Sequence, residues 1–286
     1  MRSLDDFKFL MEDHLDAVDS KNFSIELFKL CGIFIVRSAF QPIEVMNWQK
    51  AWKDFSNSYP QRNVNQFNPP EVLEELSPEL LSITKQPKIL DILEQIMGPE
   101  IGLFRARFMV KDKNARNRVH LHDDFCYQIG WPHKASVFLA LSEVNELNGG
   151  LRLYLGTSKF GYLGDAGEIN KELLGENWPS VAPSLMPGDF VIMASTTWHE
   201  SSPYVSGPDR VITDFIYQPA DDFSTKEIVR GKGILQKTFM NTHSDGTLIK
   251  PTEKTMDLHE RFFMRSRISK LKELQQKINA FEKLES

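Results

Sequence analysis

The sequence lacks the features that mark several specialised classes of protein. Its 286 residues include only two cysteines, Cys31 and Cys126, which are too few for a disulfide framework. No segment approaches the roughly 18 consecutive apolar residues of a membrane span, and the acidic first residues are unlike a signal or transit peptide. We therefore expect a protein of a reducing compartment, the cytoplasm, with no membrane partner.

An excess of positive charge is also absent. The formal net charge is −5 at pH 7, which gives no support to nucleic-acid binding through general electrostatics. Hydrophobic residues make up 41% of the chain and aromatic residues 11%, as in ordinary globular proteins. The sequence therefore predicts a folded protein with an apolar core and no nucleic-acid partner.

Local composition and the spacing of apolar residues divide a single predicted domain, residues 1–286, into three parts. Residues 1–100 are expected to be mainly helical, because apolar residues recur there at helical spacing. Residues 101–220 contain short β-branched and aromatic segments separated by turn residues, which predicts an antiparallel sandwich or barrel. Residues 221–286 are expected to form an extension ending in a helix, which could pack on its own domain, cover a site or join two subunits.

The first candidate site is the stretch VHLHDDF, from Val119 to Phe125. On a strand, alternate side chains share a face, so His120, His122 and Asp124 would lie together. Two histidines and a carboxylate are costly to bury on one face unless they bind something. By itself this short pattern also fits a polar strand end, so the metal hypothesis needs a second signal.

The second candidate site follows the segment PGDFVIMAS, which predicts a buried strand preceded by a turn. Trp198-His199 comes after the end of that strand. Arg210 then begins another apolar segment, VITDFIY, where an arginine usually needs an anionic partner. Histidines and a carboxylate drawn from the two candidate sites could form the two-histidine, one-carboxylate triad of non-haem Fe(II) oxygenases.

Four segments, read in order, carry a resemblance to a known family. They are HDDFCY, LNGGLRLYLGTSK, PGDFVIM, and WHESSPY followed by Arg210. Together they resemble the phytanoyl-CoA hydroxylase-like family of Fe(II)/2-oxoglutarate oxygenases over roughly Leu103 to Pro219. Leu155 stands where that family often has proline, and Lys159 directly follows Ser158, with no histidine in this segment. Both departures lie outside the predicted metal ligands.

The resemblance implies a mainly β fold with helices, in which a double-stranded β-helix (jelly roll) carries N-terminal helices on one sheet. It implies that Fe(II) is bound by His122, Asp124 and His199. The cosubstrates would be 2-oxoglutarate and O2, with 2-oxoglutarate contacted by Arg210, Ser201 and Phe138. The carboxylate at Asp124, in place of the small residue of related halogenases, argues for oxygen chemistry. The expected activity is that of a dioxygenase that hydroxylates a small molecule while 2-oxoglutarate is decarboxylated to succinate and CO2.

Further polar residues near these segments are candidates for substrate contacts. Arg105, Arg107 and Lys111 alternate onto one face of a predicted strand. Such cations fit either a solvated sheet face or a site for an anionic substrate. The predicted substrate contacts are His120, Arg107, Lys111, Arg152 and Tyr127.

Two other functions remain open on the sequence alone. A cupin-like isomerase or epimerase would use His120 and His122 as its first pair of metal ligands and would not need Arg210. A jelly-roll binding protein would keep the fold without the chemistry. Turnover of 2-oxoglutarate in the presence of metal separates both from the oxygenase. The oligomeric state is expected to be a monomer, or a homodimer formed through the C-terminal helix.

Overall fold

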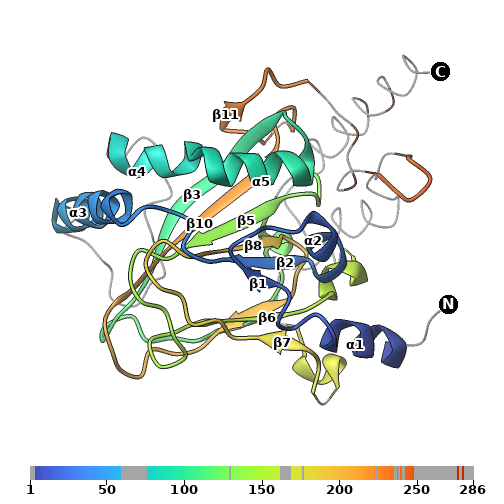
Figure 1. Cartoon of the computed structure of the whole chain (residues 1–286), viewed down its shortest axis with the longest axis horizontal. Coiled ribbons are helices and arrows are strands. Elements are labelled where there is room, and N and C mark those ends of the chain that lie inside the picture. Colours follow the sequence, from blue (N-terminus) through green and yellow to red (C-terminus); the bar gives the residue numbers. More distant parts are fainter. Residues whose placement is uncertain are drawn as a thin grey trace.

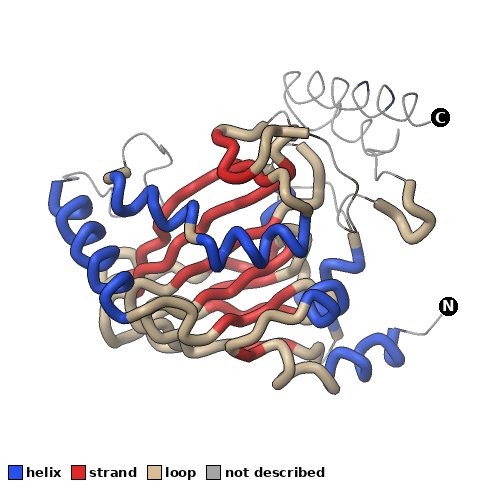
Figure 2. The backbone as a smooth tube through the Cα atoms, turned by 45° about the horizontal axis from the view of Figure 1, so that its top comes forward, coloured by secondary structure: helices blue, strands red, loops and turns tan. Residues whose placement is uncertain are grey.

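Two β-sheets face one another and form the core of the fold, as the ribbon and the backbone tube show (Figures 1 and 2). The computed structural model describes residues 4–58, 76–128, 130–161, 169–175, 177–222 and 224–234, together with 242–247 and a few single positions. All strand pairs are antiparallel except β1 with β2. This arrangement confirms the predicted jelly roll.

The larger sheet has seven strands and the smaller sheet has four. In spatial order the larger sheet consists of β1 (Asp19–Ser20), β2 (Ile33–Val36), β8 (Phe190–Ala194), β5 (Ala135–Leu139), β10 (Arg210–Pro219), β3 (Ile101–Lys111) and β11 (Glu227–Arg230). The smaller sheet consists of β4 (Val119–His122), β9 (His199–Ser201), β6 (Leu151–Tyr154) and β7 (Ser180–Val181).

Helices from the first hundred residues cover the outer face of the larger sheet (Figures 1 and 2). The described helices are α1 (Leu4–Glu12), α2 (Ile25–Cys31), α3 (Pro42–Ser58), α4 (Pro78–Ser82) and α5 (Pro87–Met97), with short 3-10 turns η2 (Ile83–Lys85), η3 (Asp124–Tyr127), η4 (Thr157–Phe160) and η5 (Lys171–Leu174). Helix α5 buries an apolar face that joins the same cluster as Phe108 of β3 and Phe215 of β10. Trp52 of α3 packs on Phe108, with ring centroids 4.9 Å apart. The predicted helical support on one sheet is therefore confirmed.

The ends of the chain differ from the simple three-part division. The β-rich run after Gly32 is strand β2, which pairs with β8 inside the larger sheet, because all four of its residues are apolar and buried. Beyond residue 220, strand β11 adds an edge beside β3. The helix expected near the C-terminus lies almost entirely outside the described residues.

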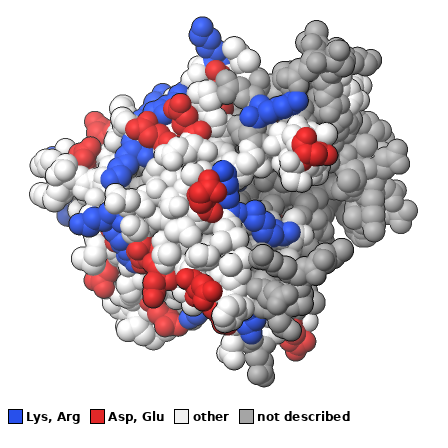
Figure 3. Space-filling view, turned by 45° about the vertical axis from the view of Figure 1, so that its right-hand side comes forward, with Lys and Arg blue, Asp and Glu red and all other residues white. Residues whose placement is uncertain are grey.

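Two features of the described residues bear on the expected partners. No helix among them combines the length and the apolar character needed to cross a membrane. On the face drawn in Figure 3, basic and acidic side chains are interspersed rather than gathered into one large patch of a single sign.

Candidate active site

Strands β4 and β9 bring two histidines together at one end of the smaller sheet. His122 and His199 are direct partners in the antiparallel register, and their ring centroids are 4.3 Å apart. The chain leaves β4 at His122 and turns at once into η3. Asp123 caps this turn, since its Oδ1 accepts a hydrogen bond of 3.0 Å from the backbone N–H of Cys126. The cap fixes the direction of the next side chain, Asp124.

Asp124 faces both imidazole rings. Its Oδ1 lies 3.6 Å from Nε2 of His122 and 3.6 Å from Nε2 of His199. One donor atom from each of these three residues lies within 4.8 Å of the others. The hydroxyl of Ser136 donates a 2.9 Å hydrogen bond to Asp124 Oδ2, which leaves Oδ1 directed at the histidines. Among the described residues, His120 is not a member of this donor group.

The outer nitrogen of each ring is held by a backbone carbonyl. His122 Nδ1 lies 2.7 Å from the carbonyl oxygen of His120, and His199 Nδ1 lies 3.0 Å from that of Thr197. Because a carbonyl oxygen can only accept, Nδ1 carries the proton in both rings and the Nε2 lone pairs point toward Asp124. This is the second layer of hydrogen bonds that orients metal-binding histidines.

The protonation states of His199 and Asp124 also suit a metal site, whereas at His122 burial lowers the pKa but the hydrogen bond and charge of Asp124 outweigh it and raise the pKa above its usual value. Burial, and then the nearby His122, lower the pKa of His199 to about 4, so its ring is neutral at pH 7. Burial raises the pKa of Asp124, but His199 and His122 outweigh it and hold that pKa below its usual range. A neutral imidazole and an ionised carboxylate are the forms that bind a metal. Two histidines and one carboxylate at this spacing fit Fe(II).

Two buried cations lie next to each other on neighbouring strands of the larger sheet. Lys111 is fully buried and Arg210 is 1% exposed, and the two are partners in the register of β3 and β10. Lys111 Nζ donates a 2.7 Å hydrogen bond to Ser201 Oγ, and Arg210 Nη1 donates a 3.0 Å hydrogen bond to the carbonyl of Gly149. Arg210 Nε has no hydrogen-bond partner within the described part of the chain.

No carboxylate accompanies this pair among the described residues. Burial lowers the pKa of Arg210 to about 9. Burial, followed by the charges of Arg210 and Arg118, lowers the pKa of Lys111 to about 7. Such shifts are what two unpaired cations produce when they are removed from water. An anion placed between them would restore both pKa values.

A cavity of about 600 Å³ extends from the metal-binding group to Arg210. We call the part of the site around Arg210, Lys111 and Ser201 its cationic end. It contains most of the residues that the sequence predicts for cosubstrate and substrate. Besides His122, Asp124 and His199, the residues that line it include Arg210, Ser201, Phe138, Arg107, His120 and Tyr127. The ring of Phe138 lies 6.2 Å from that of His199, centroid to centroid.

Two of the predicted substrate residues lie elsewhere. Arg152 is not among the residues that line the cavity, and it faces Glu146, with Nη2 and Oε1 3.6 Å apart. Lys111 lies with Ser201 and Arg210 at the cationic end. Alternation along β3 predicted the correct face for Lys111, but the sequence does not say which end of the cavity it reaches.

The residues of the site that were missed in the sequence include Asp214 and Gln128. Asp214 lies in the apolar segment that begins at Arg210, and it forms a buried ion pair with Arg107. Gln128 directly follows η3 and is 5% exposed. Both side chains line the cavity. A signal existed for Asp214, because an aspartate four residues after Arg210 on one strand shares its face.

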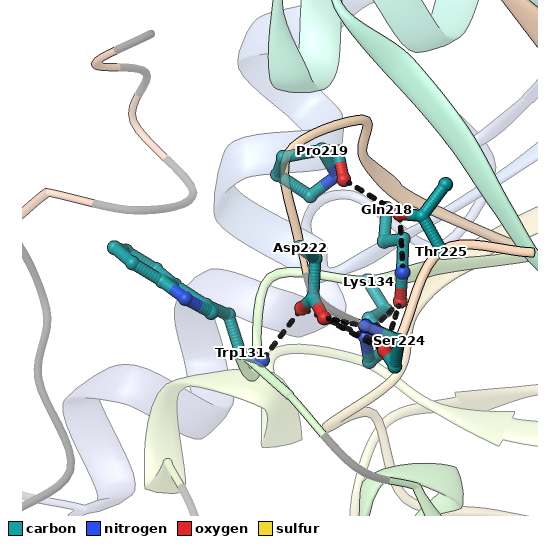
Figure 4. A network of polar contacts seen from close by, with 7 residues as sticks. All are labelled: Trp131, Lys134, Gln218, Pro219, Asp222, Ser224 and Thr225. Carbon is teal, nitrogen blue, oxygen red and sulfur yellow. Dashed lines mark hydrogen bonds and ion pairs between the residues drawn. The ribbon is translucent and has the colours of Figure 1, made fainter. Parts of the chain in front are cut away.

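A buried polar network holds the loop between η3 and β5 (Figure 4). Lys134 Nζ lies 3.2 Å from Asp222 Oδ2, and the backbone N–H of Trp131 donates to the same oxygen at 2.9 Å. Lys134 also donates to the side-chain oxygen of Gln218 near the end of β10. The network ties the segment that follows Asp124 to the strand that carries Arg210, so it fixes the two halves of the site relative to each other.

The fold and the site together define a jelly-roll protein with a two-histidine, one-carboxylate metal centre. The chain belongs to the phytanoyl-CoA dioxygenase (PhyH) family, whose sequence model matches residues 31–212. This confirms the resemblance carried by the four sequence segments. Among curated proteins, no significant match to the chain was found.

Several solved structures share the fold. One is the non-heme α-ketoglutarate-dependent carbocyclase SnoK from nogalamycin biosynthesis, with a TM-score of 0.58 and 20% identity over 71% of this chain and 86% of that one. EctD from S. alaskensis with 2-oxoglutarate and 5-hydroxyectoine has a TM-score of 0.58 and 16% identity over 74% and 86%. HygX from Streptomyces hygroscopicus with nickel and 2-oxoglutarate bound has a TM-score of 0.55 and 14% identity over 69% and 88%. At these identities the likeness is one of fold.

Proposed function

We propose that the protein is an Fe(II)- and 2-oxoglutarate-dependent oxygenase that oxidises a small molecule. One observation carries the proposal. Three metal-binding side chains and the buried Arg210 line one cavity, and Lys111, a second buried cation without a carboxylate partner among the described residues, lies beside Arg210 and Ser201. This combination suits a metal together with an anion, and 2-oxoglutarate can supply that anion through a carboxylate. Membership of the PhyH family supports the same conclusion.

His122, Asp124 and His199 would hold the iron. Three protein ligands leave the remaining positions open for a cosubstrate and for O2. When bound, Fe(II) would activate O2, the oxidant that supplies one oxygen atom for the conversion of 2-oxoglutarate to succinate and CO2 and the other for the oxidation of a substrate C–H bond. We propose hydroxylation as the outcome. Similar structures named as a carbocyclase and an epimerase mark the other outcomes that the same fold accommodates.

Arg210, Lys111 and Ser201 would bind the distal carboxylate of 2-oxoglutarate. A buried cation without an anion is strongly unfavourable, and an arginine fork is well suited to a carboxylate. The hydroxyl of Ser201 already accepts from Lys111 and can donate its own proton to the anion. Phe138 would lie beside the carbon chain of the keto acid. We therefore assign Lys111 to the binding of the cosubstrate, although the sequence predicted it as a substrate contact.

Gly149 completes this end of the pocket. Its φ of +97° is one that residues with a Cβ rarely adopt, and a Cβ there would collide with Cδ of Lys111. The carbonyl of Gly149 also holds Arg210. The Asn-Gly-Gly turn therefore lets the backbone approach both cations, which is a role for this turn beyond its place in the family pattern.

The remaining substrate candidates are Arg107, His120 and Tyr127. Arg107 is paired with Asp214, and this pairing reduces the support for an anionic substrate. Arg152, which faces Glu146 outside the cavity lining, is left out of the proposed site.

The decisive experiment is the visible spectrum of anaerobic protein with Fe(II) and 2-oxoglutarate. Chelation of the keto acid to Fe(II) gives a charge-transfer band, which we expect in the wild-type protein and in the exposed control Arg116→Ala. The band should be lost in His199→Ala and in Arg210→Ala. A wild-type protein that binds neither iron nor 2-oxoglutarate would refute the oxygenase and leave the isomerase or binding-protein alternatives.

A further inference from the structure

Two polar side chains in the cavity wall have hydrogen-bonding capacity that no described residue uses. Gln128 is 5% exposed, yet neither Nε2 nor Oε1 of its amide has a partner within the described residues. Asp214 is 1% exposed, and its Oδ1 is likewise without a partner, while Oδ2 accepts from Arg107. Buried polar atoms almost always have partners, and leaving them without one is costly. Both side chains line the cavity, so a molecule bound there can supply these partners.

The two residues lie close to the proposed iron and away from the proposed keto-acid end. Gln128 follows η3, the turn that begins with the metal-binding Asp124. Asp214 lies four residues along β10 from Arg210, which on an extended strand is about 13 Å. A molecule that reaches Gln128 and Asp214 is therefore distinct from the anion held at Arg210.

The positive charges on this side of the cavity already have partners in the protein. Arg118 Nη2 lies 2.9 Å from Glu200 Oε2. Burial raises the pKa of Asp214, and the charges of Arg107 and then Arg105 oppose that rise, so both guanidinium groups act on this carboxylate. An incoming anion would have to compete with Asp214 for them. A hydroxyl or amine, in contrast, can donate to Asp214 Oδ1 without breaking an existing pair.

We propose, resting on the proposed function, that Gln128 and Asp214 select the substrate that is oxidised. The substrate is a neutral or cationic small molecule that carries hydroxyl or amino groups, and not an acyl or phosphate anion. One of its O–H or N–H groups donates to Asp214 Oδ1. A second polar group exchanges hydrogen bonds with the Gln128 amide, which can both donate and accept.

The test compares small probes on the full-length, metal-free protein by thermal melting. The probes are myo-inositol and glucosamine for the proposed class, and hexanoate and glucose 6-phosphate for the anions. The variants are Gln128→Leu and Asp214→Asn, each with an exposed control, Gln95→Leu and Asp54→Asn. General solvent effects on Tm cancel when each variant is compared with its control.

We expect the polyol and the amine to raise Tm in the wild type and in both controls. In Gln128→Leu their affinity should fall by about tenfold or more, because a buried hydrogen-bonding pair is lost. Without any probe, Gln128→Leu should melt no lower than the wild type, since an unpaired buried amide is replaced by an apolar side chain. This second readout does not depend on the identity of the substrate, and it remains usable if Asp214→Asn fails to fold.

The proposal is overturned if only the anions stabilise the protein, or if every probe gives the same shift in the wild type and in Gln128→Leu. It is also overturned if Gln128→Leu without probe melts well below its control, because the amide would then have a structural partner. The Fe(II)–2-oxoglutarate band separates this failure from failure of the oxygenase. A band retained in the wild type and in Gln128→Leu leaves the oxygenase standing, whereas a band missing from the wild type refutes the proposed function itself.

Discussion

Replacement of Arg210 by methionine should separate the stability of the protein from its binding of 2-oxoglutarate. In the protein without ligands, Arg210 is a buried cation that donates a hydrogen bond from Nη1 to the Gly149 carbonyl. Burial lowers its pKa to about 9, so it remains charged at pH 7. Methionine fills a similar volume without a charge. The substitution removes the unfavourable burial of the cation together with the group that would bind the keto acid.

Two contributions decide the expected change in the free energy of unfolding: removal of the buried charge and loss of the hydrogen bond to Gly149. Replacing buried ionic groups by apolar residues of similar volume is often neutral or stabilising by about 1–4 kcal/mol. Loss of the hydrogen bond to Gly149 costs about 1 kcal/mol. The net free energy of unfolding should therefore lie between about 1 kcal/mol below and about 3 kcal/mol above that of the wild type, at roughly 2–4 °C in Tm per kcal/mol. At a concentration one hundred times its Kd, 2-oxoglutarate should stabilise the wild type by about 2.7 kcal/mol and leave Arg210→Met unaffected.

Thermal melting of the metal-loaded protein, with and without 2-oxoglutarate, measures both effects. Arg116→Met, an exposed arginine, is the matched control and should change the free energy of unfolding by no more than about 0.5 kcal/mol. If Arg210→Met melts several degrees lower than the control and still responds to 2-oxoglutarate, the reasoning fails. Arg210 would then be an anchor for the Gly149 turn and not a binding group.

Three further predictions concern the same two ends of the cavity. The pKa of Lys111 is lowered to about 7, and a bound dicarboxylate favours its charged form. Binding of 2-oxoglutarate should therefore take up a proton and weaken as pH rises above about 7. Calorimetry in two buffers should detect this uptake, and Lys111→Met should abolish it. Gly149→Ala should weaken 2-oxoglutarate binding and destabilise the protein by about 1–3 kcal/mol, since the backbone is strained and Lys111 is displaced; an unchanged Tm and band would contradict this. Ser136→Ala should lower metal affinity by about 10–100-fold in a metal titration, because Asp124 loses the hydrogen bond that orients it; an unchanged affinity would show that the carboxylate is held by other contacts.

The metal centre could be predicted from the sequence because its determinants are local. His122 and Asp124 are separated by one residue, and His199 begins β9 one short turn after β8, a strand that is recognisable from its apolar run. Arg210, the proposed 2-oxoglutarate ligand, was recognisable for a similar reason, since a cation at the start of an apolar strand is rare. Alternation placed His120 on the side of His122 and Asp124, and it does line the same cavity, but its side chain is exposed and is not part of the metal-binding donor group among the described residues.

The pairing of charges could not be predicted, because it depends on contacts between distant segments. Arg107 and Arg152 look equivalent in the sequence. Arg107, however, pairs with Asp214 on the adjacent strand, whereas Arg152 faces Glu146 in a nearby loop. Strand β11 was missed because its four residues, EIVR, are too short and too polar to stand out from the surrounding segment. These features depend on tertiary contacts that residue spacing alone does not encode.

The register of β3 against β10 explains how one sheet supports both ends of the cavity. Lys111 is opposite Arg210, and Arg107 is opposite Asp214. The first cross-strand pair therefore combines two positive charges, which require an anion, whereas the second is already neutral. Both pairs project from the same face, because their positions differ by four residues on each strand. A change at Asp214 would alter the charge presented to the substrate while leaving the anion-binding pair in place, so the two specificities of the cavity can vary independently.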